Sequence, residues 1–146
     1  INIATWGSVK GIGGPAAIPK ATLDYLQATF KKVSEDAEFK KIMADLGVIA
    51  WGSTIGVVRE ALQRLRAQGY KVKGFYPKLL HPLPAQQFED FGATCKKLLL
   101  PEVNFQGQLA HFVRAETSLR PISYTICGGM PFTPEMIVTR VKEVLA

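Results

Sequence analysis

The residues best placed to bind a ligand follow the end of an apolar run. Residues 48–51 read Val-Ile-Ala-Trp, and Gly52, Ser53 and Thr54 come directly after them. An unbroken apolar run is typical of a central parallel strand, and small polar residues after it typically begin a helix. The N–H groups that begin a helix can hold an anion. An anion site at Gly52, Ser53 and Thr54 is therefore one hypothesis, and ordinary helix capping is the favoured one, because the lysine of a P-loop is missing.

A second glycine-rich stretch comes early in the chain. Gly11, Gly13 and Gly14 follow a short β-rich run, and Pro15 comes next. A dinucleotide-binding fingerprint needs a helix directly behind its glycines, and Pro15 interrupts that arrangement. We predict a flexible loop here, without a cofactor.

Two histidines and two cysteines are the candidates for nucleophilic catalysis. His81 lies between prolines in a predicted loop, and His111 lies inside a predicted helix. Cys95 falls near the end of a predicted helix, and Cys127 follows a predicted strand at the edge where it could react. A cysteine and a histidine would have to meet in space to form a catalytic pair. A small buried thiol is the commoner role, so we expect no catalytic residue and no metal site.

Glu102 and Asn104 form the best polar pair in the sequence. They stand at the end of a leucine-rich predicted strand. Acid–base catalysis would need a second carboxylate or a base close by, and none is evident. We therefore expect these two side chains to brace a loop.

The elements that would position these residues alternate along the chain. Predicted strands cover residues 1–9, 48–51, 71–76, 97–103 and 122–126. Predicted helices cover residues 21–33, 34–46, 54–68, 85–94, 107–117 and a last segment from Pro134, and Gly47 and Gly69 are read as helix stops. Strict alternation of strands and helices implies parallel strands with helices on both faces. We predict a three-layer α/β/α sandwich with a mainly parallel, five-stranded sheet in a single domain, residues 1–146.

Composition excludes several classes of protein. The 146 residues are 47% hydrophobic and 21% charged, close to the globular average, and no apolar run is long enough to cross a membrane. The net charge of +6 comes from scattered basic residues without interleaved aromatics, so we expect no nucleic-acid partner. The chain begins with isoleucine and shows no signal peptide, which favours a cytoplasmic protein.

Several separated motifs after residue 47 carry a family resemblance. Residues 48–146 resemble the C-terminal domain of the α subunit of 2-oxoacid:ferredoxin oxidoreductases, especially the 2-oxoglutarate type. The motifs are VIAWGSTIGVVRE at 48–60, YPKLLHPLP at 76–84, LPEVNFQGQL at 100–109 and RPISYTICGGMPFTPEMI at 120–137. The resemblance implies a transketolase C-terminal-like fold, and a flavodoxin-like fold is the alternative. It also implies that thiamine diphosphate and iron–sulfur clusters are held elsewhere, so that this piece carries no cofactor and provides assembly contacts.

The first third of the chain resembles a different family. Residues 14–47, reading GPAAIPKATLDYLQATFKKVSEDAEFKKIMADLG, are similar to a late segment of periplasmic tricarboxylate-type solute-binding proteins. A change of family between Gly47 and Val48 predicts an engineered chimera, made of fragments 1–47 and 48–146, that has no catalytic activity and requires no partner. The alternative is an assembly domain of a 2-oxoglutarate:ferredoxin oxidoreductase α subunit that docks onto partner subunits.

The chimera hypothesis makes a packing prediction. Apolar residues recur at helical spacing in residues 21–33, and such a stripe needs a partner surface. If the two fragments complete one sheet, these side chains should be buried against strands that follow Val48. They are Leu23, Leu26, Phe30 and Val33.

Overall fold

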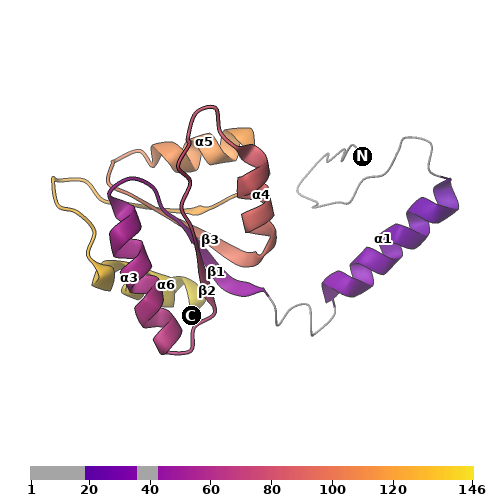
Figure 1. Cartoon of the computed structure of the whole chain (residues 1–146), viewed down its shortest axis with the longest axis horizontal. Helices are drawn as coiled ribbons and strands as arrows, with labels where there is room; N and C mark the ends of the chain where they lie inside the picture. Colours follow the sequence, from indigo (N-terminus) through magenta and orange to yellow (C-terminus); the bar gives the residue numbers. More distant parts are fainter. Residues whose placement is uncertain (1–18, 36–42) are drawn as a thin grey trace. The chain divides into compact units, whose positions relative to one another are not determined.

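The chain divides into two units, Ile1–Met43 and Ala44–Ala146, and the computed structural model describes residues 19–35 and 43–146. In the first unit it describes one helix, α1 (Lys20–Glu35) (Figure 1). Leu23 and Leu26 of α1 are not buried within the first unit, with exposed fractions of 40% and 37%, and their packing against strands that follow Val48 stays a prediction. The side chains of Phe30 and Val33 lie outside the described residues. Of the helix predicted at residues 34–46, residues 36–42 lie outside them, and the rest of the prediction is wrong, because Ser34 and Glu35 end α1 and residues 44–46 form part of a strand.

The second unit is built on a parallel sheet in the order β2-β1-β3-β4 (Figure 1). Its strands are β1 (Ala44–Ile49), β2 (Val72–Phe75), β3 (Cys95–Glu102) and β4 (Ile122–Thr125). Its helices are α3 (Thr54–Ala67), α4 (Ala85–Ala93), α5 (Gln108–Glu116) and α6 (Pro134–Leu145). The described residues thus hold four strands where the sequence predicted five, and the fifth, at residues 1–9, lies outside them.

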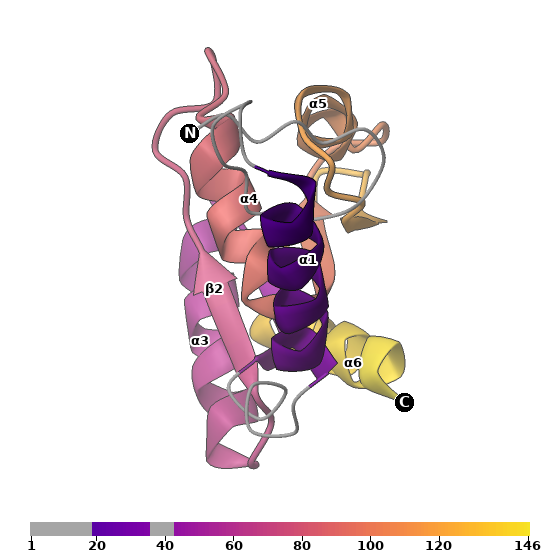
Figure 2. The same cartoon turned by 90° about the vertical axis from the view of Figure 1, so that its right-hand side faces the viewer.

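The helices form a layer on each face of this sheet (Figures 1 and 2). On one face, fully buried Val58, Leu62 and Val141 of α3 and α6 pack against Leu46 and Val48 of β1. A second buried cluster, on the other side of the same strands, joins α4 and α5 to the sheet; it includes Phe88, Val113, Ile49 and Leu100. Successive strand residues point to opposite faces, so an unbroken apolar strand is covered twice. The predicted three-layer fold is confirmed.

Gly47 does not end a helix, as the sequence predicted. It lies inside β1 and pairs with Lys73 of β2 and Leu98 of β3. A Cβ atom on Gly47 would lie 2.6 Å from Cys95 Sγ and 2.8 Å from a ring carbon of Phe91. The absence of a side chain at Gly47 therefore allows α4 to approach the sheet. Cys95, predicted near the end of a helix, is the buried first residue of β3.

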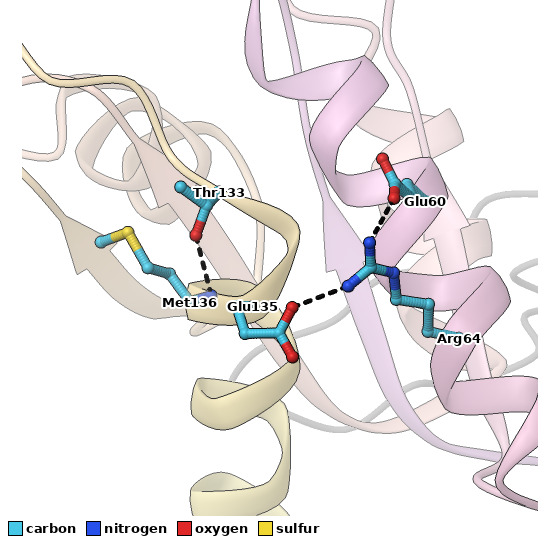
Figure 3. A network of polar contacts seen from close by, with 5 residues as sticks. All are labelled: Glu60, Arg64, Thr133, Glu135 and Met136. Atoms are coloured by element: carbon cyan, nitrogen blue, oxygen red, sulfur yellow. Dashed lines mark hydrogen bonds and ion pairs between the residues drawn. The ribbon is translucent and has the colours of Figure 1, made fainter.

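An exposed ion-pair network joins α3 to α6 (Figure 3). The guanidinium of Arg64 donates to Glu60 at 2.5 Å and to Glu135 at 2.7 Å. The hydrogen bond and charge of Glu60 are the main cause of a raised pKa at Arg64, with Glu135 adding to them. The backbone N–H of Met136 donates to the Thr133 hydroxyl, which caps α6. Because these groups are exposed, buried contacts rather than ion pairs hold the two helices together.

Candidate functional site

The carboxyl ends of the four strands lie along one edge of the sheet, which we call the carboxyl edge. Its loops are residues 50–53, 76–84, 103–107 and 126–133. The chain reverses its direction across the sheet between β1 and β3, which is where open parallel sheets usually bind ligands. Lys78 is the only Lys, Arg, Asp or Glu in these four loops. The carboxyl edge therefore carries almost no charge.

Large exposed apolar side chains gather in the same loops. Within residues 44–146 the exposed large hydrophobic residues are all on the carboxyl edge, and we call them the rim residues. They are Leu79 (52% exposed), Val103 (42%), Phe105 (82%) and Met130 (73%). Exposed apolar side chains that collect in one region of a soluble protein typically mark an interaction site.

A buried carboxylate fixes the loop that carries two of the rim residues. Glu102 is 1% exposed and ends β3. Its Oε1 accepts from the backbone N–H of Leu109 at 2.8 Å and from Asn104 Nδ2 at 3.1 Å, and its Oε2 accepts from the N–H of Ala110 at 3.0 Å. The first N–H groups of α5 are thus bonded to the protein's own carboxylate, which leaves them unavailable to an external anion.

Asn104 continues this brace. Its Oδ1 accepts from the N–H of Gly107 at 2.6 Å and from the N–H of Gln108 at 3.3 Å. Phe105 lies between the two ends of this bonded loop and projects into solvent. The prediction that Glu102 and Asn104 brace a loop is confirmed, and its consequence is that an exposed aromatic ring is held by a fixed backbone.

Gly107 is the position in this loop where a side chain is least tolerated. Its φ is +65°, and a Cβ atom would lie 2.5 Å from Ser123 Oγ. We expect Gly107→Ala to lower the free energy of unfolding by about 1–3 kcal/mol, since it adds left-handed strain and crowding. Gly69→Ala is the control, because Gly69 has φ +87° but no atom within 4 Å of its Cβ position. Urea denaturation measures both variants. An equal loss of unfolding free energy in Gly107→Ala and Gly69→Ala would show that crowding at Gly107 is unimportant.

The loop after β2 is fixed by packing. Pro77 is buried, and Leu80 and Leu83 pack against the cluster beneath α4 and α5. The ring of His81 lies 5.9 Å from the ring of Phe112 on α5. These anchors leave Leu79 facing solvent between them.

The loop after β4 presents Met130. Gly128 and Gly129 adopt φ of +121° and +79°, and Phe132 returns to the core, where its ring lies 4.9 Å from that of Tyr124. Cys127 is exposed, so the expectation of a buried thiol is wrong for this residue. The described residues contain no group of three or more His, Cys, Asp or Glu that could hold a metal ion.

The segment predicted to hold an anion begins α3. The Thr54 hydroxyl donates to the Trp51 carbonyl at 2.7 Å, and the Thr54 N–H donates to the same oxygen at 3.2 Å. Ser53 is the N-cap residue, without a capping bond from its side chain, and Gly52 has φ +57°. The Thr54 hydroxyl thus bonds back to the loop before the helix, and both capping and anion binding at Gly52, Ser53 and Thr54 stay predictions.

An open recess lies beside the braced loop. It has a volume of about 440 Å³ and is lined by Gln106, Gln108 and His111. His111 was a candidate because of its residue type, whereas neither glutamine and none of the rim residues was predicted to be functional. The signal for the rim was present in the sequence as four turn-rich loops with large apolar residues and a single charge.

A comparison with protein families covers most of the second unit. Residues 44–137 match the model of the pyruvate:ferredoxin oxidoreductase core domain II. The chain belongs to this family. The family match begins at the first residue of β1 and ends inside α6, so it covers most of the unit that carries the carboxyl edge.

Curated relatives of this domain are oxidoreductase subunits. The chain is 32% identical over 103 residues to 2-oxoacid:ferredoxin oxidoreductase 2, subunit alpha, of Aeropyrum pernix. It is 34% identical over 103 residues to 2-oxoglutarate oxidoreductase subunit KorA of Mycobacterium tuberculosis. Each match covers 70% of this chain but only 16% of the relative, so the chain spans a small part of their length.

A solved structure resembles the chain over nearly its whole length. It is the 2-oxoglutarate:ferredoxin oxidoreductase from Magnetococcus marinus, described with 2-oxoglutarate, coenzyme A and succinyl-CoA bound. The identity is 55%, the TM-score is 0.71, and the match covers 99% of this chain and 27% of that one.

This match overturns the chimera hypothesis. One oxidoreductase polypeptide matches both sides of the supposed junction at Gly47 and Val48, and that junction falls inside β1. The expected solute-binding-protein origin of residues 1–47 is not supported. The alternative, a domain of an oxidoreductase α subunit, fits the findings. None of the described helices has the length and hydropathy needed to span a membrane.

Proposed function

We propose that the chain is an assembly domain of a 2-oxoacid:ferredoxin oxidoreductase α subunit and that it docks through its carboxyl edge. The observation that carries the proposal is the gathering of the rim residues on an edge with a single charged side chain. Interface cores are depleted in charge and enriched in aromatic residues and methionine, as this edge is. Phe105 is the best candidate for an anchor, because a rigid exposed aromatic contributes more to binding than a mobile one.

Two polar groups of this edge, Glu102 and Asn104, have structural roles, which supports docking over catalysis. Both oxygens of Glu102 accept backbone hydrogen bonds, and Asn104 holds the loop. A general base must reach a substrate proton, and a fully bonded buried carboxylate is poorly placed to do so. In this proposal the cofactors are held by other parts of the enzyme. The substrate class is a 2-oxoacid, and 2-oxoglutarate is favoured by the 55% identity to the Magnetococcus marinus enzyme.

Co-purification tests this function. The chain would be co-expressed with the remaining α-subunit domains and the partner subunit of the oxidoreductase from the same organism. We expect Phe105→Ser to reduce the recovered complex by about tenfold or more, since it removes an aromatic anchor from an interface core. The free variant should keep its melting temperature, because Phe105 is 82% exposed.

Lys97→Ser is the matched control, since Lys97 is an exposed residue of β3 away from its carboxyl end. It should assemble like the unmodified chain. Full assembly of Phe105→Ser, or an equal loss with Lys97→Ser, would refute docking through the carboxyl edge.

A further inference from the structure

The outer edge of β2 differs from the other edge of the sheet in its charge. Within the described residues β2 pairs with β1 alone, on one side. The strand at the opposite edge, β4, contains no charged residue, whereas the segment 61–88 around β2 contains five Lys and Arg and no Asp or Glu. Of these five, Arg64 is paired with Glu60 and Glu135 and so adds little net charge, and the carboxylate on the other side of the segment, Glu89, bonds to Ser118.

The backbone of β2 has hydrogen-bonding groups that point away from the sheet. The carbonyls of Lys71 and Phe75 accept from the N–H groups of Asp45 in β1 and of Ala50 directly after it. Because successive carbonyls of a strand alternate in direction, those of Val72 and Gly74 face outward. The Val72 carbonyl indeed accepts from a side chain, Arg66 Nε, at 3.1 Å. Val72 is buried and the other residues of β2 are half-buried, and a strand edge whose outward groups lack a strand partner can pair with another extended chain.

Positively charged side chains lie on both faces of this edge. On the α3 face, the Arg59 guanidinium lies 4.9 Å from the centre of the Tyr76 ring, and Arg66 is bonded to Val72. Burial raises the pKa of Tyr76, and the positive charges of Arg66 and Arg59 oppose that rise. Both arginines therefore lie near the Tyr76 phenol. Lys73 is the neighbour of Val72 in the strand and points to the other face.

We propose that the outer edge of β2 binds an extended acidic segment of a partner protein, which adds to the sheet as a further strand. The N–H groups of that strand replace Arg66 at the Val72 carbonyl and bond to Gly74, as in other cases of strand addition. Arg66 is then released to pair with a carboxylate, together with Arg59 and Lys73. Residues 1–9, which the sequence predicts as a strand, contain no Asp or Glu, so charge favours a separate partner over them.

The test titrates the full chain with a defined probe, the capped peptide Glu-Thr-Glu-Val-Glu-Thr, and measures binding by NMR. We expect shifts centred on the amides of Val72–Phe75 and binding that weakens with added salt. Lys73→Glu should raise the dissociation constant about tenfold or more, with Lys73→Gln between it and the unmodified chain. Lys97→Glu makes the same change of charge in β3 and should change the dissociation constant less than about twofold.

Two further probes separate strand addition from attraction to any polyanion. The same peptide with alternate backbone nitrogens methylated keeps its charge but cannot pair, so it should not bind. Equal binding by the methylated peptide, equal weakening by Lys97→Glu, or the same shifts with a short oligothymidylate would overturn the proposal. Phe105→Ser should bind the peptide normally, since the site is independent of the carboxyl edge. A loss of peptide binding in Phe105→Ser would contradict the assignment of the peptide site to β2.

Discussion

Replacing Glu102 with alanine should lower the free energy of unfolding by about 3–5 kcal/mol. The change leaves the N–H groups of Leu109 and Ala110, both buried, without an acceptor, and it opens a cavity where a 1% exposed side chain was. Asn104 also loses its partner. The expected result is a molecule in which β3 is no longer tied to the start of α5.

Urea denaturation of the unmodified chain and of two variants measures this effect. Glu102→Gln keeps one acceptor oxygen and nearly the same shape, so it should lose about half as much stability as Glu102→Ala. A loss of unfolding free energy below about 1 kcal/mol for Glu102→Ala would show that the hydrogen bonds accepted by Glu102 contribute little to stability. Hydrogen exchange at Leu109 and Ala110 should become faster in both variants.

Gly47→Val should have the second-largest effect, a loss of about 3 kcal/mol. Valine fits a strand by propensity, but its Cβ would overlap the positions of Cys95 Sγ and the Phe91 ring, so the sheet and α4 would be forced apart. If Gly47 ended a helix instead, the substitution would leave this packing untouched.

Gly56→Ala is a control for which we expect the opposite change in stability. Gly56 lies in α3 with no atom within 4 Å of its Cβ position, so alanine there should stabilise the fold by about 0.5–1 kcal/mol. Thermal melts of the two variants should shift in opposite directions. An unchanged melting temperature in Gly47→Val would contradict the packing described for β1.

Gly47 also shows what could not be predicted from the sequence, namely where β1 begins. The apolar run from Val48 predicted a central parallel strand covered on both faces, because apolar residues without alternation indicate such a strand. The start of that strand was missed. Leu46 and Gly47 continue a helical apolar spacing and end in a helix-stop residue, and only the positions of Phe91 and Cys95 in space explain the glycine.

The candidate site was predicted in part. Glu102 and Asn104 were identified as a brace because both are polar and follow a strand. The N–H groups they bond to could not be identified without the geometry of α5. Phe105 was not predicted as functional, since an aromatic residue in a sequence gives no sign of whether it faces the core or the solvent. Cys127 was placed in the interior by its residue type alone.

The resemblance of residues 14–47 to solute-binding proteins misled for a physical reason. A glycine- and proline-containing loop followed by an amphipathic helix is a general solution in α/β proteins, so a short stretch of that pattern is weak evidence of origin. The separated motifs of residues 48–146 are more specific, and they identified the family that the core domain II match shows.

The central claim is that the carboxyl edge is buried when the oxidoreductase assembles. Hydrogen–deuterium exchange by mass spectrometry, on the free chain and on the assembled complex, tests it most directly. We predict slower exchange on assembly in residues 76–84, 103–107 and 126–133, with residues 68–71 and 117–121 at the opposite edge unchanged. Slower exchange confined to the opposite edge, or no change at the rim residues, would contradict the account.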